Sequence, residues 1–210
     1  LLDAEGPHFS FGASVEEHLP AQCTAMLEGL HRLVLQMVEY PVPILVAVRG
    51  QCLGGGLEVA CAGGMIFAAP DAQLGQPEIR LGVFAPAASV LLPPRIGQIA
   101  AEDLLISGRS VDAAEAHALR LVSRVADDPE AAACEYFDRH IARLSAAALG
   151  HALGAARGGY AAEVRRRIAE VEIARLRLGA VQHRTRTCHT RRHREQRRTH
   201  RARAVRETEG

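Results

Sequence analysis

A run of three glycines followed by a glutamate is the part of the sequence best suited to chemistry. Gly54, Gly55 and Gly56 follow a buried-type strand pattern and precede Leu57 and Glu58. Glycines let a substrate approach the backbone, and the N–H groups at a helix N-terminus lack intrahelical partners. Such donors suit an oxygen atom that gains negative charge during a reaction. The spacing alone is equally compatible with a tight turn whose glutamate only stabilises the helix dipole.

A second carboxylate, Glu78, follows Gly75, Gln76 and Pro77 in a segment that we expect to be a loop. Two opposed carboxylates can add water to a carbon–carbon double bond, because one can activate the water while the other gives a proton to carbon. The alternative is an ordinary surface glutamate. Earlier in the chain, the turn at Gly12 makes the Ala13 N–H a candidate for a second donor in the same cleft.

The elements that must position these residues alternate in type. Apolar residues at helical spacing predict a helix over 21–39, and a continuous apolar run predicts a buried strand over 43–50. A helix from Leu57 and a strand over 65–70 complete a strand–turn–helix–strand unit, which indicates an α/β fold with right-handed crossovers. Further along we expect a loop over 71–82, a Pro- and Ala-rich stretch over 83–97, and helices over 100–107, from Val111 with Asp112 as cap, over 129–149 and over 159–176.

The composition favours a cytoplasmic protein with one main domain. The chain has 210 residues, a net charge of +1 and 48% hydrophobic residues. No apolar run reaches the roughly 18–20 residues needed to cross a bilayer, and the first residues lack a signal-peptide pattern. The five cysteines form no CxxC pair, which argues against a disulfide framework or a zinc site and favours reduced core residues.

The charge is distributed unevenly along the chain. Residues 174–210 carry 12 arginines and 3 acidic residues, a net charge of +9, whereas the preceding 173 residues carry −8. The basic segment has no aromatic residue and little apolar periodicity, so we expect an Arg/His-rich tail that is disordered or frame-shifted. We expect nonspecific attraction to polyanions there and no specific binding of nucleic acid.

Three segments together resemble the crotonase (enoyl-CoA hydratase/isomerase) superfamily: FSFGA at 9–13, GQCLGGGLE at 50–58 and LGQPE at 74–78. The resemblance covers about residues 5–173. It implies a (ββα)n spiral core with C-terminal helices, with the N-terminal strands missing before Leu1 and the helical pattern ending near Ile173. Residues 1–173 are then a hydratase core, and residues 174–210 are the tail.

The resemblance also implies the site. The backbone N–H groups of Ala13 and Gly55 would form the oxyanion hole, and Glu58 and Glu78 would be the two catalytic glutamates of a hydro-lyase. It implies no metal and no cofactor, because coenzyme A belongs to the acyl-CoA substrate. It further implies a homotrimer or a dimer of trimers, and no membrane partner.

The segment after LGQPE departs from ordinary enoyl-CoA hydratases and suggests the acyl group. Phe84, Ala85, Pro86 and Ser89 stand where a glycine-rich run is usual and would shape the acyl pocket, with Ser89 as a helix cap. The whole segment is most similar to hydratases of cyclohexa-1,5-diene-1-carbonyl-CoA, which form 6-hydroxycyclohex-1-ene-1-carbonyl-CoA in anaerobic aromatic degradation. Two alternatives stay open: a general 2-enoyl-CoA hydratase/isomerase of fatty-acid oxidation, and an inactive fragment with a polyanion-binding tail.

Overall fold

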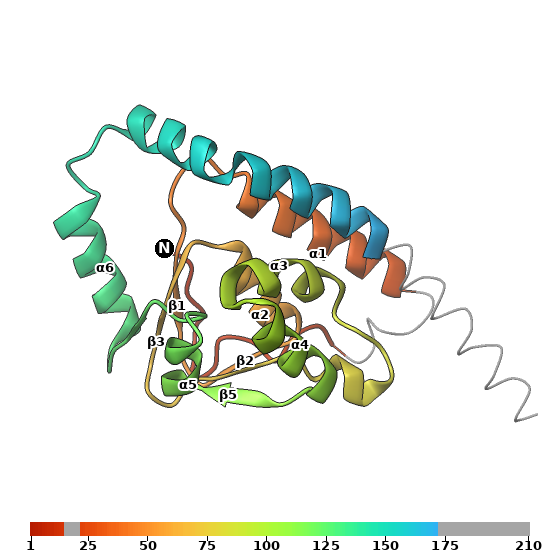
Figure 1. Ribbon diagram of the computed structural model, residues 1–210. Helices are drawn as coiled ribbons and strands as arrows, with labels where there is room; N and C mark the ends of the chain where they lie inside the picture. The colour runs from red at the N-terminus through yellow and green to blue at the C-terminus, as the bar shows by residue number, and fades with distance from the viewer. Residues whose placement is uncertain (15–21, 172–210) are drawn as a thin grey trace, which may run out of the picture. The chain divides into compact units, whose positions relative to one another are not determined.

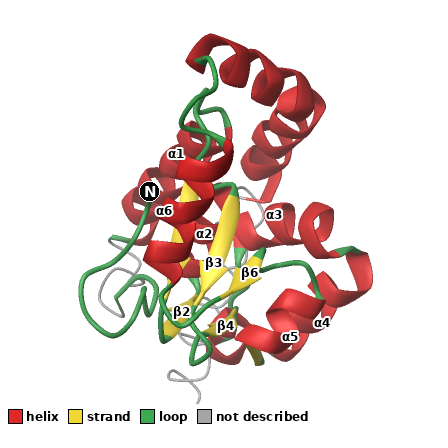
Figure 2. Ribbon diagram, turned by 90° about the vertical axis from the view of Figure 1, so that its left-hand side faces the viewer, coloured by secondary structure: helices red, strands yellow, loops and turns green. Residues whose placement is uncertain are grey.

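The strands of the computed structural model form two three-stranded sheets, and helices pack against them (Figures 1 and 2). The structure describes residues 1–14 and 22–171. One sheet has the order β1-β3-β6, and both of its strand pairs are parallel. The other has the order β2-β4-β5, with β2 parallel and β5 antiparallel to β4. The strands are β1 (Leu45–Val48), β2 (Gln51–Leu53), β3 (Met65–Ala68), β4 (Gln73–Gly75), β5 (Ser110–Asp112) and β6 (Arg124–Val125).

The chain repeats one pattern, in which a strand of the first sheet is followed by a strand of the second sheet and then by a helix. β1, β2 and α2 (Gly55–Ala62) form one such unit, and β3, β4, the 3-10 helix η2 (Pro77–Leu81) and α3 (Pro86–Ile96) form the next. Near the N-terminus, single parallel bridges join Leu2 to Val46 and Ser10 to Cys52, and α1 (Cys23–Val38) follows. The predicted α/β class and ββα spiral are therefore confirmed.

Four further helices follow α3 in the described part of the chain. They are α4 (Gln98–Ser107), α5 (Ala113–Ala118), α6 (Pro129–His140) and a last helix over residues 146–171. The last helix runs beside α1 in Figure 1, where Arg157 donates to the Val38 carbonyl and Arg165 pairs with Glu39. Within residues 1–14 and 22–171, no helix is long and apolar enough to cross a membrane.

The core explains why the predicted strand at 43–50 forms. All four residues of β1 are buried, and so are Leu57 of α2, Ile66 of β3 and Leu91 of α3. A strand covered on both faces needs a continuous apolar run, and β-branched residues suit it. α1 contributes Leu27 and Val34 to this core and ends before Pro41, as its periodicity predicted.

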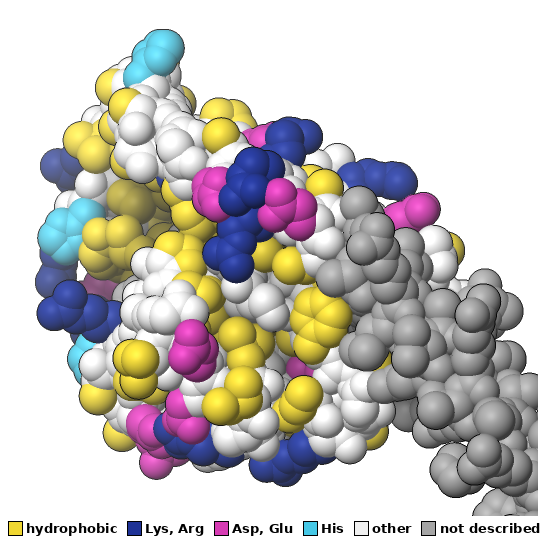
Figure 3. All heavy atoms as spheres, turned by 45° about the vertical axis from the view of Figure 1, so that its right-hand side comes forward, with side chains coloured by type: hydrophobic (Ala, Val, Ile, Leu, Met, Phe, Trp, Pro, Cys, Tyr) yellow, Lys and Arg dark blue, Asp and Glu magenta, His cyan; other side chains and the backbone are white. Residues whose placement is uncertain are grey.

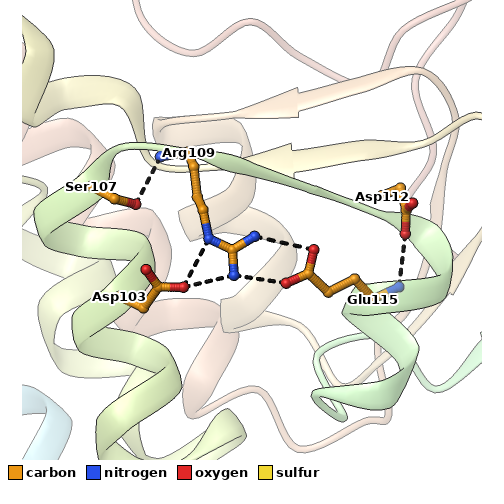
Figure 4. Close-up of polar contacts among 5 residues, drawn as sticks. All are labelled: Asp103, Ser107, Arg109, Asp112 and Glu115. Carbon is orange, nitrogen blue, oxygen red and sulfur yellow. Dashed lines mark hydrogen bonds and ion pairs between the residues drawn. The ribbon is translucent and has the colours of Figure 1, made fainter.

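An ion-pair network joins α4, β5 and α5 (Figure 4). Arg109 Nε donates to Asp103 Oδ2 at 2.8 Å, and its two terminal nitrogens donate to Glu115 at 2.7 and 3.1 Å. The Asp112 side chain accepts from the Glu115 N–H at 2.8 Å, which confirms Asp112 as the cap of α5. The Ser107 hydroxyl accepts from the Arg109 N–H. These side chains fix the turn that leads into the second sheet.

The expected loop over 71–82 is wrong in part, because it contains β4 and η2. Three-residue strands such as β2 and β4 leave too short a pattern to detect, and pairing with each other provides their hydrogen bonds. The Pro- and Ala-rich stretch over 83–97 contains α3, with Pro86 at its start and Pro93 and Pro94 inside it. Its buried face, which includes Leu91 and Leu92, offsets the hydrogen bonds that the internal prolines remove.

The predicted helices over 129–149 and 159–176 have the wrong boundaries. The break lies at residues 141–145, and the last helix passes through Gly150, Gly154 and Gly158. A Cβ on Gly150 would lie 3.2 Å from the Pro41 carbonyl oxygen, so close packing explains this glycine inside a helix. The predicted tail at 174–210, and the helix end expected near Ile173, lie outside the described residues.

The four described cysteines are free thiols, and only two of them are core residues. Cys52 and Cys61 are buried, whereas Cys134 is exposed and Cys23 is intermediate. Burial raises the pKa of the Cys61 thiol to about 11, so this thiol is protonated at neutral pH. The expectation that the cysteines are core residues is therefore wrong for Cys134.

Candidate active site

The peptide between Gly54 and Gly55 lies where β2 ends and α2 begins. Gly54 has φ +56° and ψ −128°, a conformation that side chains of L-residues disfavour. Its N–H donates to the Gly75 carbonyl at 3.0 Å, and its carbonyl accepts from the Glu58 N–H at 3.0 Å. Gly55 is the first residue of α2, so its N–H belongs to the helix N-terminus and needs no intrahelical partner.

The structure brings the two predicted oxyanion donors together. A Cβ on Gly55 would lie 3.9 Å from the Ala13 nitrogen, and a Cβ on Gly12 would lie 3.4 Å from the Gly55 nitrogen. Hydrogen bonds between Ser10 and residues 51 and 53 fix the strand-like approach to this point. Two backbone N–H groups from segments 42 positions apart in the sequence therefore meet at one end of α2.

Glu58 lies in the first turn of α2 and is 2% exposed. Its Oε1 accepts a hydrogen bond from the Ala88 N–H at 2.8 Å, in the first turn of α3. A donor N–H at a helix N-terminus favours the ionised form of a carboxylate, because the dipole places positive charge there. Glu58 is thus a buried carboxylate between two helix N-termini.

Glu78 lies in η2 and not in an irregular loop, which corrects the sequence expectation. Pro77 begins that 3-10 helix, and the left-handed residue Gly82 ends it. A Cβ on Gly54 would lie 2.8 Å from Glu78 Oε1, so the carboxylate rests against the Gly54 backbone. Gly54 therefore contacts the backbone N–H of Glu58 and the carboxylate of Glu78.

A cavity of about 300 Å³ opens beside the oxyanion pair. Apolar side chains form much of its wall, and the backbones of Gly12, Ala13, Gly55 and Gly56 reach it. Its lining residues are Phe9, Ser10, Gly12, Ala13, Met26, Leu30, Gly55, Gly56 and Val59. An apolar cavity with a few converging donors is the usual form of a small-molecule site.

The four predicted acyl-pocket residues lie at the start of α3 and do not line that cavity. Ala85 and Pro86 are buried, and they precede Ala88 by three and two residues. Because the Ala88 N–H donates to Glu58, both residues lie near the Glu58 carboxylate. Phe84 and Ser89 are partly exposed. The expectation that Ser89 caps a helix is wrong, because Ser89 lies inside α3 and its hydroxyl donates to the Ala85 carbonyl at 2.7 Å.

Sequence reasoning gave no role to Gln76 or to the Ala88 N–H. Gln76 is 1% exposed, and its Nε2 donates to the Gly54 carbonyl at 3.3 Å. The sequence carried no signal for either group, because the short strand before Gln76 leaves no detectable pattern and the Ala88 N–H belongs to the backbone. Within the described part of the chain, no group of three or more His, Cys, Asp or Glu side chains is placed to hold a metal ion.

Comparison with known proteins identifies the class to which this fold and site belong. The family model described as "Enoyl-CoA hydratase/isomerase" matches residues 1–186, and the chain belongs to that family. The cyclohexa-1,5-dienecarbonyl-CoA hydratase of Thauera aromatica is 66% identical over 172 residues, which are 82% of this chain and 67% of that protein.

Two solved structures extend the comparison to the fold. The enoyl-CoA hydratase of Thermoplasma volcanium GSS1 is 29% identical with a TM-score of 0.70, over 80% of this chain and 70% of that one. The enoyl-CoA hydratase/isomerase of Pseudoalteromonas atlantica T6c is 28% identical with a TM-score of 0.74, over 84% of this chain and 71% of that one. Both agree with the spiral architecture derived above.

Proposed function

We propose that this protein is a hydro-lyase that adds water to the cyclic dienoyl thioester cyclohexa-1,5-diene-1-carbonyl-CoA. The observation that carries the proposal is that the Ala13 and Gly55 N–H groups come together at the N-terminus of α2, where Glu58 lies in the first turn and the Glu78 carboxylate rests against Gly54. The 66% identity with the Thauera hydratase supports this choice of acyl group. The product is 6-hydroxycyclohex-1-ene-1-carbonyl-CoA.

The reaction begins with the thioester carbonyl oxygen bound by the N–H groups of Ala13 and Gly55. The water oxygen bonds to the β-carbon of the ring while the water proton passes to a glutamate. The electron pair of the double bond between the α- and β-carbons moves toward the carbonyl and gives a dienolate. The two backbone donors stabilise the negative charge on its oxygen. Each such donor contributes roughly 3 kcal/mol in characterised oxyanion holes.

A proton then adds to the far end of the dienolate, so that one double bond stays conjugated with the thioester. We assign the water proton to Glu58, because the Ala88 N–H and the N-terminus of α3 favour its ionised form. Glu78, whose carboxylate rests against Gly54, gives the proton to carbon. Solvent exchange restores both glutamates.

The test uses the purified chain, the dienoyl thioester and ¹⁸O-labelled water, with the hydroxylated product measured by mass spectrometry. Glu58→Gln and Glu78→Gln should each lower kcat by roughly 10²- to 10⁴-fold, the usual contribution of a general acid or base. Glu28→Gln is the matched control, because Glu28 is an exposed residue of α1. Unchanged rates in both catalytic variants would refute the assignment.

The choice of acyl group has its own measurement. We propose that Phe84, Ala85, Pro86 and Ser89 select the ring through the shape of the first turn of α3. The kcat/KM value should then be higher for the cyclic substrate than for crotonyl-CoA. A preference for crotonyl-CoA would favour a general 2-enoyl-CoA hydratase/isomerase instead.

Three further predictions of the sequence remain proposals. We propose that the protein forms a homotrimer or a dimer of trimers, which sedimentation velocity would measure. We also propose that it is cytoplasmic and that it turns over without any added metal or cofactor. The alternative of an inactive fragment with a polyanion-binding tail predicts no turnover, together with heparin binding that disappears when residues 174–210 are removed.

A further inference from the structure

In the part of the chain that the structure describes, Gln76 has a buried side-chain amide of which the nitrogen is hydrogen-bonded and the oxygen is not. Its side chain is 1% exposed, and its Nε2 donates to the Gly54 carbonyl oxygen at 3.3 Å. Its Oε1 is also buried and has no hydrogen-bond partner among the described residues. An apolar side chain of similar volume would avoid the cost of burying this oxygen. Buried polar atoms without a hydrogen-bond partner are rare in folded proteins, and those that occur are commonly found at functional sites.

The atom that Gln76 contacts belongs to the same peptide group as the Gly55 N–H. In a planar trans peptide, the carbonyl and the N–H point in opposite directions. A donor that holds the Gly54 carbonyl therefore also sets the direction of the Gly55 N–H. A hydrogen bond to the carbonyl also polarises the group and makes its N–H a stronger donor.

This peptide needs such a restraint, because glycines flank it on both sides. Gly54 and Gly55 carry no Cβ that would resist rotation of the plane between them. The Gly54 N–H is held by the Gly75 carbonyl, on the preceding peptide. Two hydrogen bonds hold the Gly54 carbonyl of the next peptide, one from the Glu58 N–H and one from Gln76 Nε2.

We propose that Gln76 is a positioning residue, which orients and polarises the Gly54–Gly55 peptide so that the Gly55 N–H binds the thioester oxygen. The inference rests on the proposed function, because it requires Gly55 to be an oxyanion donor. The contact of 3.3 Å is longer than usual and should shorten when negative charge develops on the substrate. Gln76 thus acts through the peptide and touches no reacting atom.

The test replaces Gln76 by methionine, which keeps the length of the side chain and removes the donor. One readout is the infrared carbonyl stretch of bound benzoyl-CoA, ¹³C-labelled at the thioester carbon, since this aromatic ring does not add water. The wild type should lower this frequency relative to free ligand, and Gln76→Met should lose much of the shift. The value of kcat should fall about tenfold with little change in KM, less than the 10²- to 10³-fold loss on removing a donor itself.

Gln73→Met is the matched control, because Gln73 lies on β4 three positions before Gln76 and the side-chain amide that donates to the Gly54 carbonyl is that of Gln76. It should keep both the infrared shift and kcat. Gln76→Leu provides a second variant without a donor, and circular dichroism checks the folding of each. Loss of folded protein in both Gln76 variants would overturn the proposal by assigning the residue to stability.

The outcomes separate this inference from the proposed function. A full infrared shift in folded Gln76→Met would overturn the positioning role, while the loss of rate in Glu58→Gln and Glu78→Gln would still support hydration. A wild-type protein that neither lowers the carbonyl frequency nor forms the hydroxylated product would refute the proposed function, and the role of Gln76 with it.

Discussion

Replacing Gly54 by alanine should damage the site in two ways that can be measured separately. At φ +56° and ψ −128° the new residue would be strained, at a cost of about 1–3 kcal/mol of folding free energy. Its Cβ would lie 2.8 Å from Glu78 Oε1, whereas ordinary contact begins at 3.4 Å, so the carboxylate must withdraw by about 0.6 Å. Because a misplacement of about 1 Å can cost 10²-fold in rate, kcat should fall roughly tenfold to a hundredfold.

Gly97→Ala is the control that isolates the strain. Gly97 has φ +83°, and a Cβ there would have no atom within 4 Å. Both variants should lower the free energy of unfolding, measured by urea titration, but only Gly54→Ala should lower kcat in the hydration assay. Wild-type kcat in folded Gly54→Ala would show that the position of Glu78 against Gly54 does not matter for the reaction.

Two further predictions concern stability. Arg109→Lys should lower the free energy of unfolding by about 1 kcal/mol, because one ammonium group cannot bridge Asp103 and Glu115 as the guanidinium does. This loss of stability should become smaller in 1 M NaCl, which screens charges. A loss that does not depend on salt would contradict an electrostatic origin. The hydrogen bond from Arg49 holds the pKa of Asp128 below its ordinary value of 3.8, so this carboxylate stabilises the folded state above pH 3.8 and loses that effect as the pH falls through the lowered pKa. Asp128→Ala should therefore lower Tm at pH 7, and the difference from wild type should narrow below pH 3.8; an equal difference at pH 7 and pH 2.5 would exclude the charge as the cause.

The surface outside the site mixes charged and apolar side chains. Figure 3 shows apolar side chains interspersed with acidic and basic ones over one face. Ile99 and Ile106 on α4, and Leu81 at the end of η2, are 81%, 73% and 70% exposed.

The sequence by itself determined the elements whose signals are local. The helical periodicity of α1 and the continuous apolar run of β1 predicted both correctly, because each pattern spans enough residues to exclude alternatives. The cap at Asp112 was also predicted, since its side chain bonds a backbone N–H only three residues away. The motif of Gly54 to Glu58 indicated a helix N-terminus for the same local reason.

Tertiary structure decided the features that depend on distant partners. β2 and β4 are strands because each supplies the other's hydrogen bonds, and α3 tolerates Pro93 and Pro94 because its buried face compensates. Local pattern could not reveal either one, nor the helical turn that holds Glu78.

The site itself divides in the same way. The sequence supplied the residue types of Ala13, Gly55, Glu58 and Glu78, and the family resemblance gave them roles. Only the folded chain brings Ala13 beside Gly55, and only it places Gln76 on the Gly54 carbonyl. The physical reason is that two flanking glycines restrain a peptide little, so a hydrogen bond from another segment adds to the local bond from Glu58 in setting its direction.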